Sequence, residues 1–202
     1  IGAIGIAPSA PDVVYVGTGE ANARNSMGVG RGVWKSRDGG RTWAYLGLAG
    51  TEHIEAILVH PTDPEIVWLT ALGPAGSDGS DRGIYTSTDG GNSWRKVLYA
   101  DERTGAFELV IDPSNPEHLL ASTWEFRRWP WFFESGGPGS GLYRTMDGGE
   151  TWARLSAESG IPSGDLGRIG LSIARNQTNT LYALVEAEPS GLFRSDDGGG
   201  TW

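Results

Sequence analysis

The octapeptide Ser36-Arg37-Asp38-Gly39-Gly40-Arg41-Thr42-Trp43 decides the fold, because close copies of it return three more times along the 202-residue chain. The other copies are STDGGNSW at 87–94, TMDGGETW at 145–152 and SDDGGGTW at 195–202. Their aspartates, Asp38, Asp89, Asp147 and Asp197, are spaced 51, 58 and 50 residues apart. A period near 50 residues is typical of propeller blades and too long for most helical repeats.

Each octapeptide has the chemistry of a tight turn. Its aspartate can accept hydrogen bonds from the backbone amides that follow, and the two glycines supply positive φ at little cost. The Thr or Ser hydroxyl can donate to the same carboxylate, and the closing tryptophan can pack over the turn. We therefore expect a structural role for the aspartates and for Trp43, Trp94, Trp152 and Trp202. The motif also explains eight of the 32 glycines.

Three short apolar runs precede the octapeptide in every unit, and each run reads as a β-strand. The first runs are 4–6, 57–59, 109–111 and 171–173; the second are 13–16, 66–69, 119–122 and 181–184; the third are 32–36, 83–87, 141–145 and 191–195. A fourth strand begins at each tryptophan, and helical periodicity is absent. The pattern predicts an all-β chain, a β-propeller of four-stranded antiparallel blades.

About four blades are expected, at residues 1–50, 51–102, 103–160 and 161–202. The last of these lacks most of its fourth strand. Because propellers usually hold four to eight blades, we expect the chain to be part of a larger propeller, with further blades of a parent chain as partners.

Composition excludes several classes of protein. A formal net charge of −9 argues against a nucleic-acid partner. No cysteine is present for a disulfide, and no apolar stretch approaches the roughly 20 residues of a membrane-spanning helix. The three histidines are scattered, so no cofactor and no metal site are expected. Asp78 and Asp81 leave two interpretations open, a calcium loop or, as we favour, a solvated loop.

The insertions between second and third strands should share one face of a propeller, opposite the octapeptide turns. They comprise residues 20–31, 73–82, 125–140 and 186–190. The third is the longest and carries Phe126, Trp129, Trp131, Phe132 and Phe133. So many aromatic side chains must pack on something. Either they cap the blade or plug the channel, or they form a surface for a ligand.

Carboxylates on the same face raise the question of catalysis. Glu20 and Glu125 occupy equivalent positions where second strands enter their insertions. Glu108 interrupts an apolar first strand, where it either lines the channel or, as we favour, forms a structural ion pair. Glycoside hydrolysis needs a carboxyl pair, whereas ion pairs with Arg24, Arg127 or Arg128 would make the two insertion glutamates structural. The catalytic residue stays unknown, with these three glutamates as weak candidates. The candidate ligand-binding residues are Arg24, His53, Glu55, Trp124, Arg127, Arg128, Trp129, Trp131, Phe132 and Arg168.

The octapeptide resembles the Asp box, or BNR repeat, over the whole chain. The amino-acid sequences of the units are most similar to those of bacterial sortilin/VPS10-type repeat proteins, and the motif also occurs in xyloglucanase-type glycoside hydrolases and sialidases. The resemblance implies a propeller, but a shared fold does not establish a shared enzymatic activity. We expect an exported, extracellular or periplasmic, non-catalytic binding propeller for a protein, peptide or carbohydrate ligand. The alternatives are a glycoside hydrolase acting on a polysaccharide and a structural segment of a multi-propeller scaffold.

Overall fold

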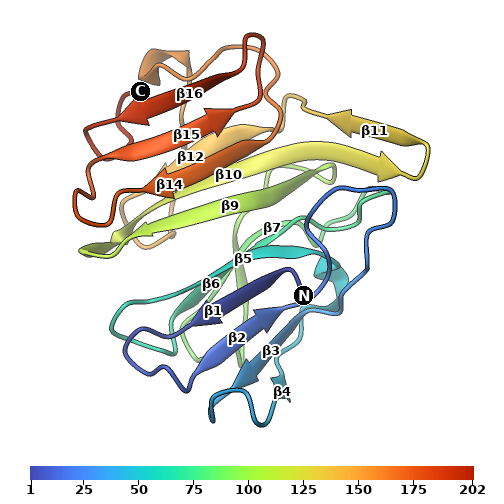
Figure 1. Cartoon of the computed structure of the whole chain (residues 1–202), viewed down its shortest axis with the longest axis vertical. Coiled ribbons are helices and arrows are strands. Elements are labelled where there is room, and N and C mark those ends of the chain that lie inside the picture. The colour runs from blue at the N-terminus through green and yellow to red at the C-terminus, as the bar shows by residue number, and fades with distance from the viewer.

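A computed structural model describes residues 1–202 as an all-β protein with only two short 3₁₀ turns (Figure 1). The strands are β1 (Ala3–Ile6), β2 (Val14–Gly17), β3 (Val33–Ser36), β4 (Ala44–Tyr45), β5 (Ile54–Val59), β6 (Val67–Ala71), β7 (Gly83–Ser87), β8 (Arg95–Leu98), β9 (Thr104–Asp112), β10 (Asn115–Trp129), β11 (Phe132–Ser135), β12 (Gly141–Thr145), β13 (Ala153–Arg154), β14 (Ile169–Ile173), β15 (Leu181–Val185) and β16 (Gly191–Ser195). The 3₁₀ turns are η1 (Ala49–Thr51) and η2 (Ala157–Ser159).

Four antiparallel sheets form four blades, as the repeat predicts. Blade 1 is β1-β2-β3-β4, blade 2 is β5-β6-β7-β8, blade 3 is β9-β10-β12-β13 with β11 added, and blade 4 is β14-β15-β16. Each sheet falls inside one of the four residue ranges expected from the sequence. The first strands are neighbours in the order β1, β5, β9, β14, so they line the inner side of the array.

The hydrophobic core lies between neighbouring blades. One cluster joins blades 1 and 2 and includes Tyr15 and Ile57. A second joins blades 2 and 3 around Trp68 and Leu119, and a third joins blades 3 and 4 around Leu120. Because alternate side chains of a strand point to opposite faces of its sheet, each blade can bury apolar side chains against both neighbours.

The Asp-box turns have the predicted geometry. In the first copy, Asp38 Oδ1 accepts the backbone N–H groups of Arg41 and Thr42 at 2.9 and 2.8 Å, and the Thr42 hydroxyl donates to Oδ2 at 2.6 Å. The paired glycines of all four copies have φ between 69° and 92°, a region that side chains with a Cβ rarely adopt. These contacts hold the pKa of Asp38 down at about 2.

The tryptophans of the four boxes differ in what they touch. Trp43 is 41% exposed and donates its indole N–H to Gly40 of its own turn. Trp94 instead reaches across to blade 1, where it donates to the Leu46 carbonyl at 2.9 Å. Trp152 packs against the cluster between blades 2 and 3, and Trp202 against that between blades 3 and 4.

Residues 125–140 correct one expectation, since the predicted loop contains a β-hairpin. Strand β10 runs without a break for 15 residues, out of blade 3 and as far as Trp129, and β11 pairs with its outer end. The register sets Trp129 opposite Phe132, which leaves Pro130 and Trp131 as the turn. Aromatic residues favour strands, and proline presets a turn. Figure 1 shows β11 at the outer end of β10, beyond the body of blade 3.

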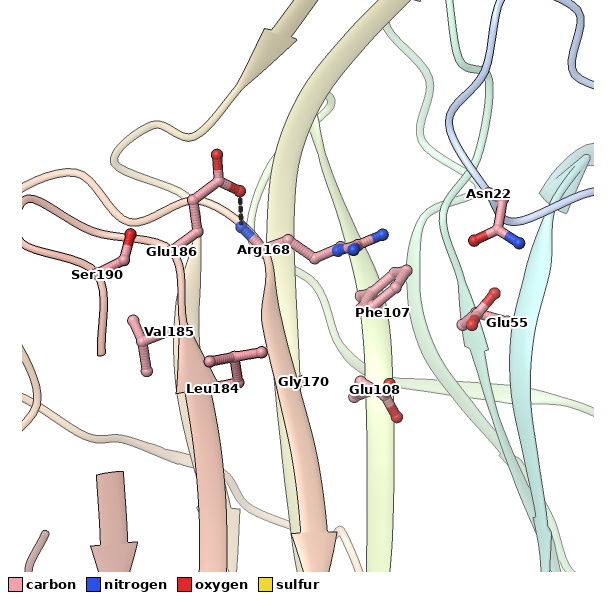
Figure 2. Close-up of a pocket in the computed structure, with 10 residues that line it drawn as sticks. All are labelled: Asn22, Glu55, Phe107, Glu108, Arg168, Gly170, Leu184, Val185, Glu186 and Ser190. Atoms are coloured by element: carbon pink, nitrogen blue, oxygen red, sulfur yellow. Dashed lines mark hydrogen bonds between the residues drawn. The ribbon is translucent and has the colours of Figure 1, made fainter. Parts of the chain in front are cut away.

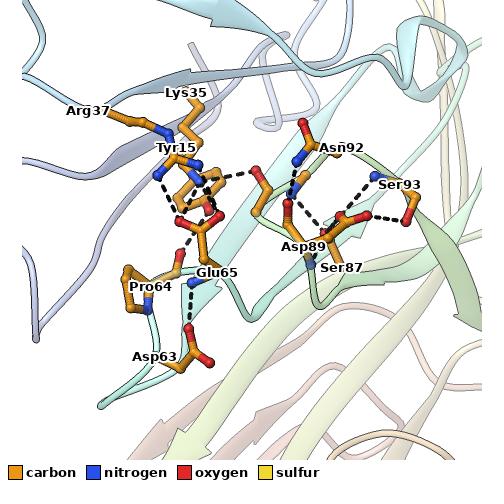
Figure 3. A network of polar contacts seen from close by, with 12 residues as sticks. Tyr15, Lys35, Arg37, Asp63, Pro64, Glu65, Ser87, Asp89, Asn92 and Ser93 are labelled. Carbon is orange, nitrogen blue, oxygen red and sulfur yellow. Dashed lines mark hydrogen bonds and ion pairs between the residues drawn. The ribbon is translucent and has the colours of Figure 1, made fainter.

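A charged network ties blade 1 to blade 2 near the second Asp box (Figure 3). The Lys35 ammonium, on a side chain only 3% exposed, donates to Glu65 at 3.1 and 3.2 Å and to the Gly90 carbonyl at 3.2 Å. Arg37 donates to both oxygens of Glu65 at 2.9 and 3.0 Å. The Tyr15 hydroxyl donates to the Pro64 carbonyl at 2.8 Å.

Candidate functional site

The insertions of all four blades meet on one face, opposite the Asp-box turns. The hairpin of blade 3 makes most of these contacts: Arg128 donates to Asn25 of blade 1, and Arg127 donates to Asp78 of blade 2. On its other side, the Ser135 hydroxyl donates to Glu186 of blade 4 at 2.8 Å. The hairpin therefore links the insertion-bearing face across the array.

The aromatic residues of blade 3 divide into two groups. Trp124 and Phe126 are at most 2% exposed and stack with ring centroids 4.4 Å apart in a small core beneath the insertions. By contrast, Trp131 is 82% exposed and Phe132 is 44% exposed, while Trp129 is half-buried. The buried pair bears out the interpretation that these residues cap the blade, while a ligand surface stays a prediction for the exposed residues. Trp124 packs within the protein and does not present a surface to a ligand.

A cleft of about 500 Å³ opens at the insertion-bearing end of the inner strands (Figure 2). Blades 2, 3 and 4 contribute inner-strand residues or the residues beside them, and the insertions of blades 1 and 4 close its edges. Its lining residues are Asn22, Glu55, Phe107, Glu108, Arg168, Gly170, Leu184, Val185, Glu186 and Ser190. Three of them, Glu55, Glu108 and Arg168, are candidates from the sequence.

Glu55 on β5 and Glu108 on β9 place two half-buried carboxyl groups in this cleft. Neither carboxyl group forms a hydrogen bond or ion pair with the protein. Burial and the nearby Glu108 charge raise the pKa of Glu55 to about 7. Burial also raises the pKa of Glu108, against the opposing effect of Arg168. The expectation that Glu108 sits in a structural ion pair is wrong, and the alternative, that it lines the channel, holds.

Arg168 reaches the cleft from the residue immediately before β14. Its backbone N–H donates to Glu186 at 2.8 Å, and its carbonyl accepts the Glu186 N–H at 3.0 Å. The guanidinium lies over two aromatic rings, 5.4 Å from the centroid of Phe107 and 5.8 Å from that of Trp124. Backbone and stem are therefore fixed, while the guanidinium forms no hydrogen bond with a protein group.

The other two weak catalytic candidates are engaged elsewhere. Glu20 forms an ion pair with Arg24 at 2.5 Å and accepts the Gly28 N–H at 3.1 Å. Glu125 pairs with Arg103 at 3.1 Å, not with the arginines of its own insertion, and accepts the Gly139 N–H at the same distance. The structure thus places both glutamates in contacts that order their insertions.

The remaining candidates also lie apart from the cleft lining. His53 is 1% exposed, and burial lowers its pKa. Arg127 is buried and holds Asp78, while Arg128 bonds to the Asn25 side chain and to the Phe132 carbonyl. Asp78 therefore faces an arginine, and no group of three or more potential metal ligands occurs in the chain.

Sequence reasoning missed Asn22, Phe107 and Glu186 as cleft residues. Phe107 stands beside Glu108 on β9, but the bulge in the pairing of β9 with β10, between Ala121 and Thr123, breaks the simple alternation. Glu186 directly follows the last residue of β15. In the strand register it corresponds to Gly19 and Trp124, one residue before the positions of Glu20 and Glu125. Its place at the start of the fourth insertion was the available signal.

The opposite end of the inner strands has a different character. A second cleft, also about 500 Å³, is lined mainly by apolar side chains such as Ile6, Leu58 and Val110, with Arg175 at its edge. The first cleft, which is lined by Glu55 and Glu108, and this apolar cleft share strands β5 and β9.

None of the helical segments is long and apolar enough to cross a membrane.

Fold and repeat together define an Asp-box β-propeller. The family model for Sortilin-Vps10 (sortilin, neurotensin receptor 3) matches residues 31–160, which is more than half of the chain. The chain belongs to this family.

Relatives and solved structures add the xyloglucanases. A xyloglucanase of Paenibacillus sp is 26% identical over 206 residues, covering 83% of this chain and 18% of that protein. A xyloglucanase of Hypocrea jecorina (strain QM6a) is also 26% identical, and the match covers 86% of this chain and 18% of that protein. The chain thus spans under a fifth of the length of these relatives.

The solved structures agree on the fold. An ancestral GH74 enzyme has a TM-score of 0.68 at 20% identity, covering 98% of this chain and 23% of that one. The GH74 xyloglucanase from Xanthomonas campestris has a TM-score of 0.69 at 20% identity, and the match covers 98% of this chain and 29% of that one. At such identity the likeness concerns the propeller fold alone.

Proposed function

We propose that the cleft hydrolyses a glycosidic bond of a polysaccharide, with Glu55 as the general acid and Glu108 as its partner carboxylate. One observation carries the proposal: two half-buried carboxyl groups from adjacent inner strands open into one cleft without a protein partner. Glycoside hydrolases use a pair of carboxyl groups that flank the scissile bond.

The environments of the two groups suit different roles. Burial, and after it the charge of Glu108, raise the pKa of Glu55 to about 7, so Glu55 keeps its proton up to about that pH and can protonate the leaving oxygen. Glu108 lies in the field of Arg168, which favours its charged form. In its charged form it serves as the nucleophile or as the base that activates water.

The relatives support hydrolysis over our expectation of a non-catalytic binder. Two xyloglucanases are related over most of this chain. Because this chain spans only part of their length, their activity is carried over here as a proposal. A polysaccharide lies outside the cell, so the same proposal includes export.

The test is release of reducing ends from a panel of polysaccharides that includes xyloglucan. Glu55→Gln and Glu108→Gln keep the side-chain volume, and each should lower kcat by roughly 10²- to 10⁴-fold. Glu150→Gln is the matched control, because Glu150 lies in the third Asp box and pairs with exposed Arg95. Turnover that survives in both cleft variants at the parent rate contradicts the proposal.

A second candidate function is ligand binding at the hairpin tip. Trp131 is 82% exposed, and Phe132 and Phe133 lie beside it in β11. Aromatic side chains of this kind anchor glycans or protein partners. Trp131→Ala should weaken polysaccharide or protein binding without changing the thermal midpoint. Binding that is unchanged in this variant removes the tip from consideration.

A further inference from the structure

Arg168 stands out in the cleft because its charge has no partner. Three arginines on the same face form ion pairs: Arg24 with Glu20, Arg103 with Glu125, and Arg127 with Asp78. The one carboxylate in contact with Arg168, that of Glu186, accepts the backbone N–H and the Ser135 hydroxyl. Figure 2 shows the Arg168 side chain extending away from that carboxylate, over Phe107.

The guanidinium is also held in place. The rings of Phe107 and Trp124 support it, and Trp124 is itself fixed by stacking on Phe126 and by a hydrogen bond to Ser135 at 3.0 Å. A cation–π contact of this kind leaves N–H groups of the guanidinium free to donate. A positioned, unpaired guanidinium matches a carboxylate, which it can bind with two parallel hydrogen bonds.

We infer that Arg168 binds the carboxylate of a uronic acid residue, so that the substrate is an acidic polysaccharide. This inference rests on the proposed function and names its substrate class. A neutral sugar offers Arg168 only single hydroxyl acceptors and no opposite charge. The carboxylate of a uronic acid is attached to the sugar ring, so its capture would also orient the ring in the cleft that holds Glu55 and Glu108.

The other charges of the cleft permit this ligand. Below the pKa of Glu55, about 7, that carboxyl group is neutral, which removes one source of repulsion. Glu186 keeps its two donors. The carboxylates of Glu108 and Glu186 are the remaining anions of the cleft, and Arg168 offsets the field of Glu108.

The test compares two polymers that differ only in the carboxylate. Polygalacturonate and the same polymer after reduction of its carboxylates to primary alcohols are titrated into the full chain, about one pH unit below the Glu55 pKa. Arg168→Met keeps an apolar stem over the two rings, and Arg175→Met, in the apolar cleft at the opposite end, is the matched control. Binding and reducing-end release are both measured.

The parent should bind polygalacturonate at least roughly 10-fold more tightly than the reduced polymer, as expected for charge-assisted hydrogen bonds. Arg168→Met should abolish that preference, and Arg175→Met should retain it. Arg175→Met removes the same charge at the opposite end of the inner strands, so a preference lost only in Arg168→Met reports recognition at that position.

Failure of this inference differs from failure of the proposed function. Equal affinity for both polymers, binding of neither, or a preference that survives in Arg168→Met overturns the role of Arg168. Hydrolysis of a neutral polysaccharide with no preference for the acidic one does so too, and leaves the proposed function intact. Preferential binding of polygalacturonate without hydrolysis of any polymer supports Arg168 and overturns catalysis.

Discussion

Glu65 and Glu55 belong to the same blade and have opposite surroundings. Glu65 accepts hydrogen bonds from Lys35 and Arg37, which lower its pKa (Figure 3). Glu55 has no partner, and burial with the Glu108 charge raises its pKa to about 7 (Figure 2). A charge that the protein has neutralised holds blades together, whereas a carboxyl group left without a partner is available to a substrate.

The largest effect on stability is expected when Glu65 is removed. Glu65→Ala leaves the Lys35 ammonium buried with only the Gly90 carbonyl as partner. Removing one member of a buried pair is strongly destabilising, but the Glu65 side chain is 33% exposed, so we expect the unfolding free energy to fall by about 2 to 3 kcal/mol. Urea denaturation measures it.

The control for this prediction is Glu150→Ala, because both Glu150 and its partner Arg95 are more than half exposed. It should change the unfolding free energy by no more than about 0.5 kcal/mol. Equal effects of the two substitutions would show that the Lys35 network does not stabilise the contact between blades.

The second-largest effect is a gain in stability, produced by a substitution of Glu55. The folded-state pKa of Glu55 is raised from 4.5 to about 7, so its contribution to stability is fully present below pH 4.5 and is lost as the pH rises through 7. Glu55→Gln cannot ionise and should be more stable than the parent at pH 8 by about 1 to 2 kcal/mol. The two proteins should converge near pH 4, and a difference independent of pH would refute this assignment.

The smallest effect concerns the Asp boxes. Hydrogen bonds from Ser93 and Ser87 lower the pKa of Asp89 from 3.8 to about 2. The stability it contributes is present above pH 3.8 and is lost as the pH falls through about 2. Asp89→Asn should therefore lower the thermal midpoint at pH 6 and flatten its decline in acid. Asp165→Asn serves as the surface control, and an unchanged acid profile in Asp89→Asn would contradict the role of the carboxylate.

Most of the fold was predictable because the same pattern of three strands and a turn occurs four times in the sequence. The octapeptide fixes each turn through local chemistry, and the runs before it mark the strands. The hairpin of blade 3 was not predictable as such, since Phe132 and Phe133 pair with β10 only because that strand continues far beyond its blade. The hairpin occurs in blade 3 alone, so the other repeats offer no equivalent segment with which to recognise it.

The site was predictable only in part. Glu55, Glu108 and Arg168 were candidates from their places on or beside first strands, and the cleft brings them together. Their partners were not predictable, because the ion pair of Glu125 with Arg103 depends on how blade 3 folds back on itself. Trp124 also shows this limit, since its neighbours Phe107 and Phe126 decide that it is buried.

The unbroken course of β10 has a consequence for recognition. The strand runs through the core of blade 3 and carries Trp129 at its outer end, where β11 pairs with it, so the hairpin tip is joined to the body by two paired strands. A partner that meets Trp131 meets a preorganised arm, and association there loses little of the conformational entropy that ordering a free loop would cost.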